Sequence, residues 1–209
     1  MTPDTAGPRR TGRTGRPADR AREGHVLAAA LEVLAERDYD RVTLETVATR
    51  AGTAKTTLYR RWGGKEDLVL DAIASVGRPP EADRLPEEGS LRADLIAITD
   101  SDWLGGVTSR LRVLGGLASA ARHSARLADA VRTGITEPYV AAYRALLDRA
   151  VTRGVVSAEL VDRLPLLALV VPTMSTEALT GAGGPVDRAH FVSVVDWILL
   201  PALGLPPED

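Results

Sequence analysis

Apolar residues recur along most of the chain at the three- and four-residue spacing of an α-helix. In the first helical segment, residues 19–37, one stripe contains Leu27, Ala30, Leu31 and Leu34. The same period predicts further helices at 44–50, 54–61, 65–76, 91–99, 107–123, 124–153, 160–179 and 187–203. No segment keeps the strict alternation of a β-strand, so the pattern predicts an all-α fold.

Breaks in this pattern divide the chain into parts. Residues 1–17 are rich in Gly, Pro, Thr and Arg without periodicity, so a disordered basic arm is expected. A compact N-terminal domain is expected at 18–63, a connecting helix at 64–76, a proline-containing linker at 77–89 and a larger helical domain at 90–209. Pro138 is expected to kink or break the 124–153 helix, and the TGAGGP stretch at 180–185 to separate the last two helices.

The most informative segment is 42–65, VTLETVATRAGTAKTTLYRRWGGK. Thr43 is a suitable N-cap for a short helix, Gly52 can take the positive φ of a tight turn, and Thr53 is expected to cap the next helix. Leu58 provides an apolar anchor under that helix. Two short helices joined by a glycine turn are typical of a helix-turn-helix, whose second helix can enter the major groove of DNA.

The outward side chains of the second helix suit nucleic acid. They are short hydroxyls, one aromatic ring and cations, all able to bond phosphates or base edges: Lys55, Thr56, Thr57, Tyr59, Arg60 and Arg61. With Thr43, Thr53 and Lys65 they form the predicted DNA-binding set. The alternatives are a half-buried Tyr59 and solvated arginines. Glu45 either stabilises the start of its own helix or accepts from a cytosine amine.

Charge is distributed unevenly along the chain. Residues 1–65 hold 13 Lys and Arg against 8 Asp and Glu, a net charge of +5, whereas residues 66–209 hold 13 against 20, a net charge of −7. A basic N-terminal part on an acidic body favours a module that binds a polyanion. The arginines at 9, 10, 13 and 16 form either a DNA-contacting arm or a solvated tail.

The N-terminal segment resembles the tetracycline-repressor (TetR) family of regulators. The resemblance is specific over residues 22–73 and architectural beyond them. It is carried by Gly52, the Thr57-Leu58-Tyr59 tripeptide, Trp62 and the Lys65-Glu66-Asp67-Leu68 opening of the fourth helix. Trp62 stands where the family more often has phenylalanine. Gly64 stands where Ser or Asn is common as an N-cap, and Gly caps only slightly less well.

This resemblance implies a one-component transcription regulator. It implies backbone contacts for Tyr59, a phosphate contact for Lys65 and base contacts for the surface from Lys55 to Arg60. Most members it resembles are repressors, so we expect a homodimer released from a pseudo-palindromic operator in double-stranded DNA by a small effector. Activation, ligand-enhanced binding and the absence of any ligand remain alternatives.

The last two predicted helices suit a subunit interface. Each carries a broad apolar face, and two such helices at a chain terminus favour a four-helix contact between subunits, as the family resemblance also implies. The predicted interface residues are Leu167, Val171, Phe191, Val194, Val195, Ile198 and Leu199. Part of each face must also belong to the core of the single chain.

The middle helices are where an effector pocket is expected. Large adaptable side chains are available there, and the predicted lining is Trp103, Leu111, Leu114, Tyr139, Tyr143 and Met174. The alternative is that most of these residues are ordinary core. Such a lining favours an apolar or aromatic ligand over a charged one.

Other functional classes have little support in the sequence. The three histidines, His25, His123 and His190, share no metal-ligand spacing, and Ser119 lies in GLASA, which lacks the second glycine of a nucleophile elbow. No phosphate-binding glycine loop occurs, and the chain contains no cysteine. We therefore expect no catalytic residues, no metal and no cofactor. No apolar run approaches the roughly 20 residues of a membrane span, so we expect a cytoplasmic protein.

Overall fold

The computed structural model describes residues 17–80, 84–104, 106–174 and 187–206, and every regular element within these ranges is helical. The N-terminal elements are α1 (Pro17–Glu36), η1 (Tyr39–Arg41), α2 (Leu44–Arg50), α3 (Lys55–Arg61) and α4 (Lys65–Ser75). The later elements are α5 (Leu91–Asp100), α6 (Gly106–Ala121), α7 (Ala125–Val131), η3 (Arg132–Thr136), α8 (Glu137–Thr152), η4 (Ala158–Arg163), α9 (Leu164–Leu167), α11 (Arg188–Val194), η5 (Val195–Leu199) and α12 (Leu200–Ala202). The predicted all-α fold is confirmed.

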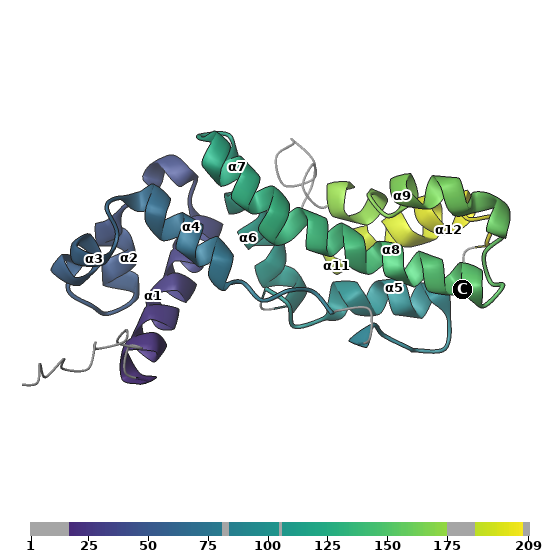
Figure 1. Ribbon diagram of the computed structural model, residues 1–209, viewed down its shortest axis with the longest axis horizontal. Coiled ribbons are helices and arrows are strands. Elements are labelled where there is room, and N and C mark those ends of the chain that lie inside the picture. The colour runs from purple at the N-terminus through teal and green to yellow at the C-terminus, as the bar shows by residue number, and fades with distance from the viewer. Residues whose placement is uncertain (1–16, 81–83, 105, 175–186, 207–209) are drawn as a thin grey trace, which may run out of the picture.

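The molecule is elongated, with a head at one end and a body at the other (Figure 1). The head consists of α1 to α4, and α2 and α3 lie at its outer edge. The far end of the body contains α5, α8, α9, α11 and α12, while α6 and α7 lie between the two ends. The head is therefore connected to the body mainly through the packing of α1 and α4 on α6 and α7.

The apolar stripe of α1 faces the core as its period predicts. Leu27, Ala30 and Leu34 are buried, and Leu31 is half-buried against the same cluster. Each buried leucine contributes roughly 1.5–3 kcal/mol relative to an exposed one. Through this stripe, α1 packs into the core of the head and also contacts α6.

A glycine allows the close crossing of α1 and α6. A β-carbon built on Gly116 of α6 would overlap the backbone carbonyl of Leu34 in α1. The neighbouring hydroxyl of Ser119, also in α6, accepts a hydrogen bond from the backbone N–H of Tyr39 at 3.3 Å. The head is thus held to α6 by backbone contacts as well as by side chains.

Two prolines are preceded by widened helical turns. The π-type segment η3 comes just before Pro138, and η5 comes just before Pro201. A proline ring clashes with the carbonyl four residues earlier and cannot donate a hydrogen bond, and a π turn accommodates both defects. The prediction at Pro138 is therefore refined, since α7, η3 and α8 run on as one helical rod with a wide turn.

Two expectations about helix ends are wrong. The third helix begins at Lys55 rather than at residue 54, and its N-cap is Ala54 without a side-chain hydrogen bond, so Thr53 does not cap it. The predicted 160–179 helix is also not one α-helix. It begins as the 3₁₀ segment η4, continues as α9, is interrupted at 168–169 and is helical again at 170–174. The prolines at 165 and 172 explain the irregularity, because each removes a helical donor. The predicted N-terminal arm, the end of this helix and the 180–185 break lie outside the described residues, apart from residue 17, which begins α1.

Candidate nucleic-acid interface

The two short helices of the head are fixed by local sequence. The Thr43 hydroxyl accepts from the backbone N–H of Thr46 at 3.1 Å, and the Thr46 hydroxyl accepts in return from the N–H of Thr43, which makes a reciprocal capping box. Gly52 has φ +59°, a conformation that a β-carbon disfavours. Leu58 is fully buried under α3. The predicted N-cap, turn and anchor are all confirmed.

The opposite face of α3 is open to solvent. Lys55, Thr56 and Arg60 are exposed, and none of their side chains has a hydrogen bond or an ion pair within the described part of the chain. Thr53 and Thr57 are half-buried beside them. This face presents two cations and a hydroxyl whose donors are free for an external partner.

Tyr59 lies on the same helix but already has a partner. Its side chain is 53% exposed, and its hydroxyl donates to the carboxylate of Glu45 at 2.7 Å. This hydrogen bond raises the pKa of Tyr59 and lowers the pKa of Glu45, because it favours the neutral phenol and the charged carboxylate. The predicted half-buried alternative for Tyr59 is wrong, and a carboxylate lies at the edge of the cationic face.

Lys65 and Arg61 are engaged within the head. The Lys65 ammonium donates to the carbonyls of Tyr39 at 3.0 Å and Asp40 at 3.4 Å, and lies 4.3 Å from the centre of the Tyr39 ring. Arg61 forms an ion pair with Glu23 of α1. Arg61 is therefore less available to a ligand than Arg60. Lys65 would have to share its three donors between η1 and a phosphate.

Sequence reasoning missed the contacts that join helices distant in sequence. Trp62, which is buried, donates its ring N–H to Asp71 of α4 at 2.8 Å. Arg50 at the end of α2 bonds Glu36 at 2.9 and 2.5 Å. Only one sequence feature pointed to the hydrogen bond between Tyr59 and Glu45. It was the acidic side chain of Glu45 at the start of α2, for which the sequence showed no partner.

Comparison with known proteins identifies the family. Residues 26–72 match the family model described as bacterial regulatory proteins of the tetR family, and residues 85–198 match that of a tetracyclin repressor-like C-terminal domain. The second match alone spans more than half of the chain. This chain belongs to the TetR family. Members of this family are DNA-binding transcriptional regulators rather than enzymes, and this chain is one of them.

Individual relatives agree over most of this TetR-family chain. It is 36% identical over 184 residues to a DNA-binding transcriptional repressor TetR of Mycobacteroides abscessus, covering 86% of this chain and 92% of the relative. It is 31% identical over 196 residues to an uncharacterised HTH-type transcriptional regulator of Mycobacterium bovis, and the match covers 87% of this chain and 88% of the relative. The crystal structure of a TetR family transcription regulator is similar with TM-score 0.56 and 28% identity, covering 85% of this chain and 96% of the other. The structure of Salmonella enterica GusR is similar with TM-score 0.62 and 17% identity, and the match covers 91% of this chain and 98% of GusR. This similarity supports the fold alone.

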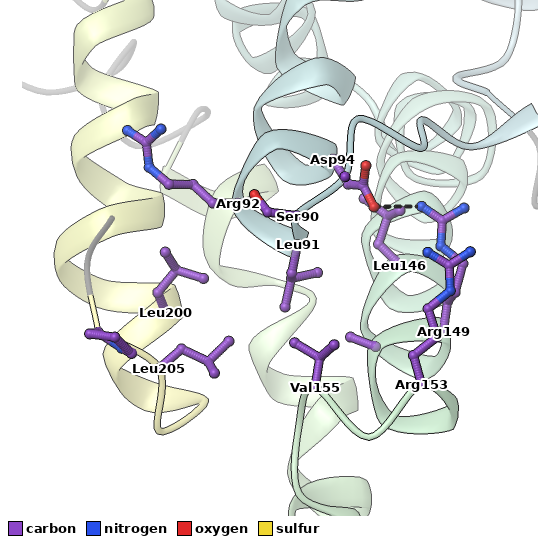
Figure 2. A pocket seen from close by; sticks show the side chains of 13 residues that line it. Ser90, Leu91, Arg92, Asp94, Leu146, Arg149, Arg153, Val155, Leu200 and Leu205 are labelled. Atoms are coloured by element: carbon purple, nitrogen blue, oxygen red, sulfur yellow. Dashed lines mark hydrogen bonds and ion pairs between the residues drawn. The ribbon is translucent and has the colours of Figure 1, made fainter. Parts of the chain in front are cut away.

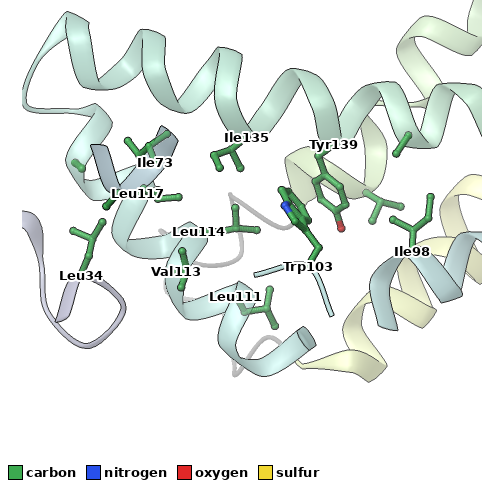
Figure 3. Close-up of a cluster of buried hydrophobic side chains, with 14 of the residues drawn as sticks. Leu34, Ile73, Ile98, Trp103, Leu111, Val113, Leu114, Leu117, Ile135 and Tyr139 are labelled. Atoms are coloured by element: carbon green, nitrogen blue, oxygen red, sulfur yellow. The ribbon is translucent and has the colours of Figure 1, made fainter. Parts of the chain in front are cut away.

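Five of the predicted effector-binding residues of this TetR-family regulator are buried in its core (Figure 3). The rings of Trp103 and Tyr139 lie 5.1 Å apart, and those of Tyr139 and Tyr143 lie 5.3 Å apart. The Tyr143 hydroxyl is 3.0 Å from the Thr99 hydroxyl, and burial raises the pKa of Tyr143 well above its usual range. Leu111 and Leu114 belong to the same buried cluster.

Met174 does not lie in this cluster. Its side chain is 39% exposed, and its role in binding an effector stays a prediction. The described cavities are also lined by other residues. One of about 300 Å³ lies between the start of α5, the end of α8 and the C-terminal turn (Figure 2). Leu91, Leu146 and Leu200 supply apolar surface, and Arg92, Arg149 and Arg153 add guanidinium groups, of which Arg149 pairs with Asp94 at 2.8 Å.

The predicted interface residues of the regulator divide into two groups. Five are buried within the single chain: Val171, Phe191, Val194, Val195 and Leu199. Their relative exposures of 0–4% place these five side chains in the core of the single chain, where they can add little area to a contact with a second subunit. Their place in a subunit interface stays a prediction. Ile198 is 42% exposed and Leu167 is half-buried. The large apolar side chains exposed near them are Leu166, Leu169, Met174 and Trp197.

The described residues contain no group of three or more acidic, histidine or cysteine side chains placed to hold a metal ion. Within the same ranges, no helix has both the length and the apolar character that crossing a membrane requires.

Proposed function

We propose that this TetR-family regulator is a homodimeric repressor whose two α3 helices enter successive major grooves of a pseudo-palindromic operator. The observation that carries the proposal is the unpartnered face of α3, formed by Lys55, Thr56 and Arg60, in a chain that is 36% identical to a transcriptional repressor. Two such helices require half-sites about 34–36 Å apart, or one turn of DNA. A regulator of chromosomal DNA acts in the cytoplasm.

Each part of the face has its own role in this proposal. Lys55, Thr56 and Arg60 contact base edges, because their donors are free in the unbound protein. Tyr59 and Lys65 position the head on phosphates, for which each must exchange or share the partner it has in the unbound chain. The predicted roles of Thr43, Thr53, Thr57 and Arg61 are secondary contacts at the edge of this face.

The test is binding to duplex DNA from upstream of the regulator's own gene, measured by fluorescence anisotropy over a salt series. Lys55→Ala and Arg60→Ala are expected to relax base preference by about 1–3 kcal/mol each. Lys65→Ala is expected to weaken binding to all sequences alike and to lower the log–log salt slope by about 0.9. Arg144→Ala, a half-buried arginine of α8, serves as the control and is expected to leave binding unchanged. Unaltered base preference in both the Lys55 and the Arg60 variants would overturn the assignment of α3.

The dimer in this proposal is formed through the C-terminal helical segments. Trp197 and Leu166 are 71% and 69% exposed, which is unusual for such large apolar side chains. Ile198 lies next to Trp197 on η5, and Leu169 follows α9. Burial of these side chains between subunits would remove the exposed apolar area from water.

The effector in this proposal binds the body and releases the operator. The cavity of about 300 Å³ is at the lower end of the usual volume for a small-molecule pocket. Its leucines suit an apolar ligand, and the guanidinium of Arg153 at its edge suits a carboxylate on that ligand, which would share or replace its partner Glu87 at 2.7 Å. A typical coupling of about 1–3 kcal/mol corresponds to roughly 5–150-fold weaker operator binding.

Calorimetry tests the effector part of the proposal. Medium-chain and aromatic carboxylic acids are titrated into the regulator with and without saturating duplex. By reciprocity, the affinity of a releasing ligand must fall by the same factor when DNA is bound. Equal affinities in the two titrations would rule out release by that ligand.

A further inference from the structure

A second cleft, of about 490 Å³, lies where the end of α1 meets α6. Four arginines line it: Arg37 follows α1, Arg41 ends η1, and Arg112 and Arg122 belong to α6. All four are exposed. The cleft therefore combines cations from the head with cations from the body.

These arginines differ from most of the others in the described ranges. Nine arginines there form ion pairs with carboxylates. Within the same ranges, the guanidinium groups of Arg37, Arg41 and Arg112 make no hydrogen bond or ion pair, and that of Arg122 donates only to the carbonyl of Ala118, at 3.2 Å. Four guanidinium groups around one cleft repel one another unless an anion lies between them.

Acidic side chains compensate half of this charge. Glu36 and Asp38 are the carboxylates of the cleft. Glu36 is bonded to Arg50 at 2.5 and 2.9 Å, and this bond, together with the positive charges of Arg50, Arg37 and Arg112, lowers its pKa. Four arginines against two carboxylates leave the cleft with a net charge of +2.

We propose that this cleft binds a multiply charged phosphate group. The planar fork of a guanidinium matches phosphate oxygens in bidentate geometry, and several forks around one cleft suit an anion with more than one charge. A fully apolar ligand would gain little between four cations. The phosphate belongs either to a free di- or triphosphate compound or to the DNA backbone beside the head, and the latter source rests on the function proposed above.

A phosphate in this cleft would bridge the two parts of the regulator. Arg37 and Arg41 belong to the head, whereas Arg112 and Arg122 are on the body side of the α1–α6 crossing. Bonds to both pairs would stabilise one placement of the head relative to α6. The ligand would therefore affect DNA affinity without touching α3.

The experiment titrates inorganic pyrophosphate into the full chain by calorimetry at low salt. The test variant is Arg112→Gln/Arg122→Gln, which removes two cations remote from α3. The matched control is Arg144→Gln/Arg163→Gln, a half-buried and an exposed arginine elsewhere on the body. Thermal unfolding of each variant verifies that it is folded. We expect wild type and control to bind pyrophosphate alike, and the test variant to bind at least about tenfold more weakly, since it lacks two guanidinium groups that donate charge-assisted hydrogen bonds.

Duplex binding distinguishes the two sources of phosphate. If DNA phosphates occupy the cleft, the log–log salt slope of duplex binding falls by up to about 1.8 in the test variant, or 0.9 for each lost contact. If a free phosphate compound occupies it, the slope stays as in wild type while pyrophosphate binding is lost. Equal pyrophosphate affinity in all three proteins together with an unchanged slope would overturn the proposal. Failure of the function proposed for α3 would show separately, as indifference of duplex binding to Lys55→Ala.

Discussion

At the scale of single residues, the hydrogen bond between Tyr59 and Glu45 holds a carboxylate beside the surface proposed to bind DNA. Glu45 has a lowered pKa because Tyr59 donates to it, so the contact is intact above the ordinary Glu pKa and is lost as the pH falls through the lowered value. At neutral pH the carboxylate is charged and lies beside the surface proposed to meet phosphates. Its negative charge therefore opposes the binding of phosphates.

Glu45→Gln is expected to tighten binding to any duplex by about fivefold. A unit charge about 4 Å away contributes about 1 kcal/mol in water, and the amide removes that repulsion. Anisotropy titrations on specific and unrelated duplexes measure the change, with Glu159→Gln on the body as the control. Weaker binding to the specific duplex alone would contradict this prediction and indicate that the carboxylate accepts from a base.

Arg110 is a buried cation that stabilises the body. Its guanidinium donates to the carbonyls of Trp103 at 3.0 Å and Thr99 at 2.7 Å, as well as to Ile98 and Ser101. These carbonyls lie at and beyond the end of α5, where acceptors lack intrahelical donors, although Ile98 also accepts from the backbone N–H and the hydroxyl of Ser101. The helix dipole and these hydrogen bonds compensate its charge, because within the described ranges it forms no ion pair.

Arg110→Met is expected to destabilise the folded chain by about 3 kcal/mol, since the carbonyls would remain buried without donors. Urea unfolding followed by circular dichroism measures this free energy. Arg144→Met, which removes an exposed i,i+4 pair with Asp148, is the control and is expected to cost less than about 0.5 kcal/mol. Similar losses in the two variants would show that the network around Arg110 contributes no more than a surface ion pair.

At the scale of elements, the crossing of α1 and α6 depends on a missing side chain. Gly116→Ala places a methyl group on the carbonyl of Leu34, and neither backbone can move without separating the helices. We expect a loss of about 1–3 kcal/mol in the free energy of unfolding, as for other overpacked sites. Gly24→Ala in α1 has open space around it and is expected to stabilise the chain by about 0.5–1 kcal/mol. The prediction would be wrong if both substitutions stabilised the chain.

At the scale of the whole molecule, polar contacts supplement the packing between head and body. His123 lies 2.8 Å from the Asp40 carboxylate, and the Ser124 hydroxyl donates to Glu66 at 3.0 Å. Arg126 lies 3.7 Å from carboxylate oxygens of both Glu66 and Asp67. Because these contacts connect α6 and α7 with η1 and α4, a shift of the body is passed to the elements that position α3.

The proposed dimer also belongs to this scale. Trp197→Glu/Ile198→Glu is expected to give monomers, because two charges would have to be buried in an apolar interface. Sedimentation velocity at micromolar concentration measures the state, and Trp197→Phe, which keeps an apolar ring, is the control. A dimer that survives the double substitution would place the interface elsewhere. Val195→Glu would not test the interface, because Val195 is buried within one chain and a buried charge would destabilise the fold.

The sequence alone determined the all-α class, most of the helices and the helix-turn-helix that carries the proposed recognition helix. The helical period, the Thr43 cap and the Gly52 turn each depend on residues within a few positions of one another. They can therefore be predicted without knowing how the helices pack. The exposure of Lys55, Thr56 and Arg60 followed from the burial of Leu58 on the opposite face. The family resemblance over residues 22–73 rested on these same local features.

Only the tertiary structure decided which partners these residues have. An apolar face can bury itself against its own chain or against a second one, and the period is identical in both cases, so Val171 and Val195 were indistinguishable from Ile198 in the sequence. The contacts of Tyr59 with Glu45 and of Lys65 with Tyr39 join residues 14 and 26 positions apart. The four arginines of the second cleft come together only because Gly116 lets α6 lie against the end of α1. Contacts between residues distant in sequence depend on the angle and position at which helices cross, and a local sequence pattern does not specify either.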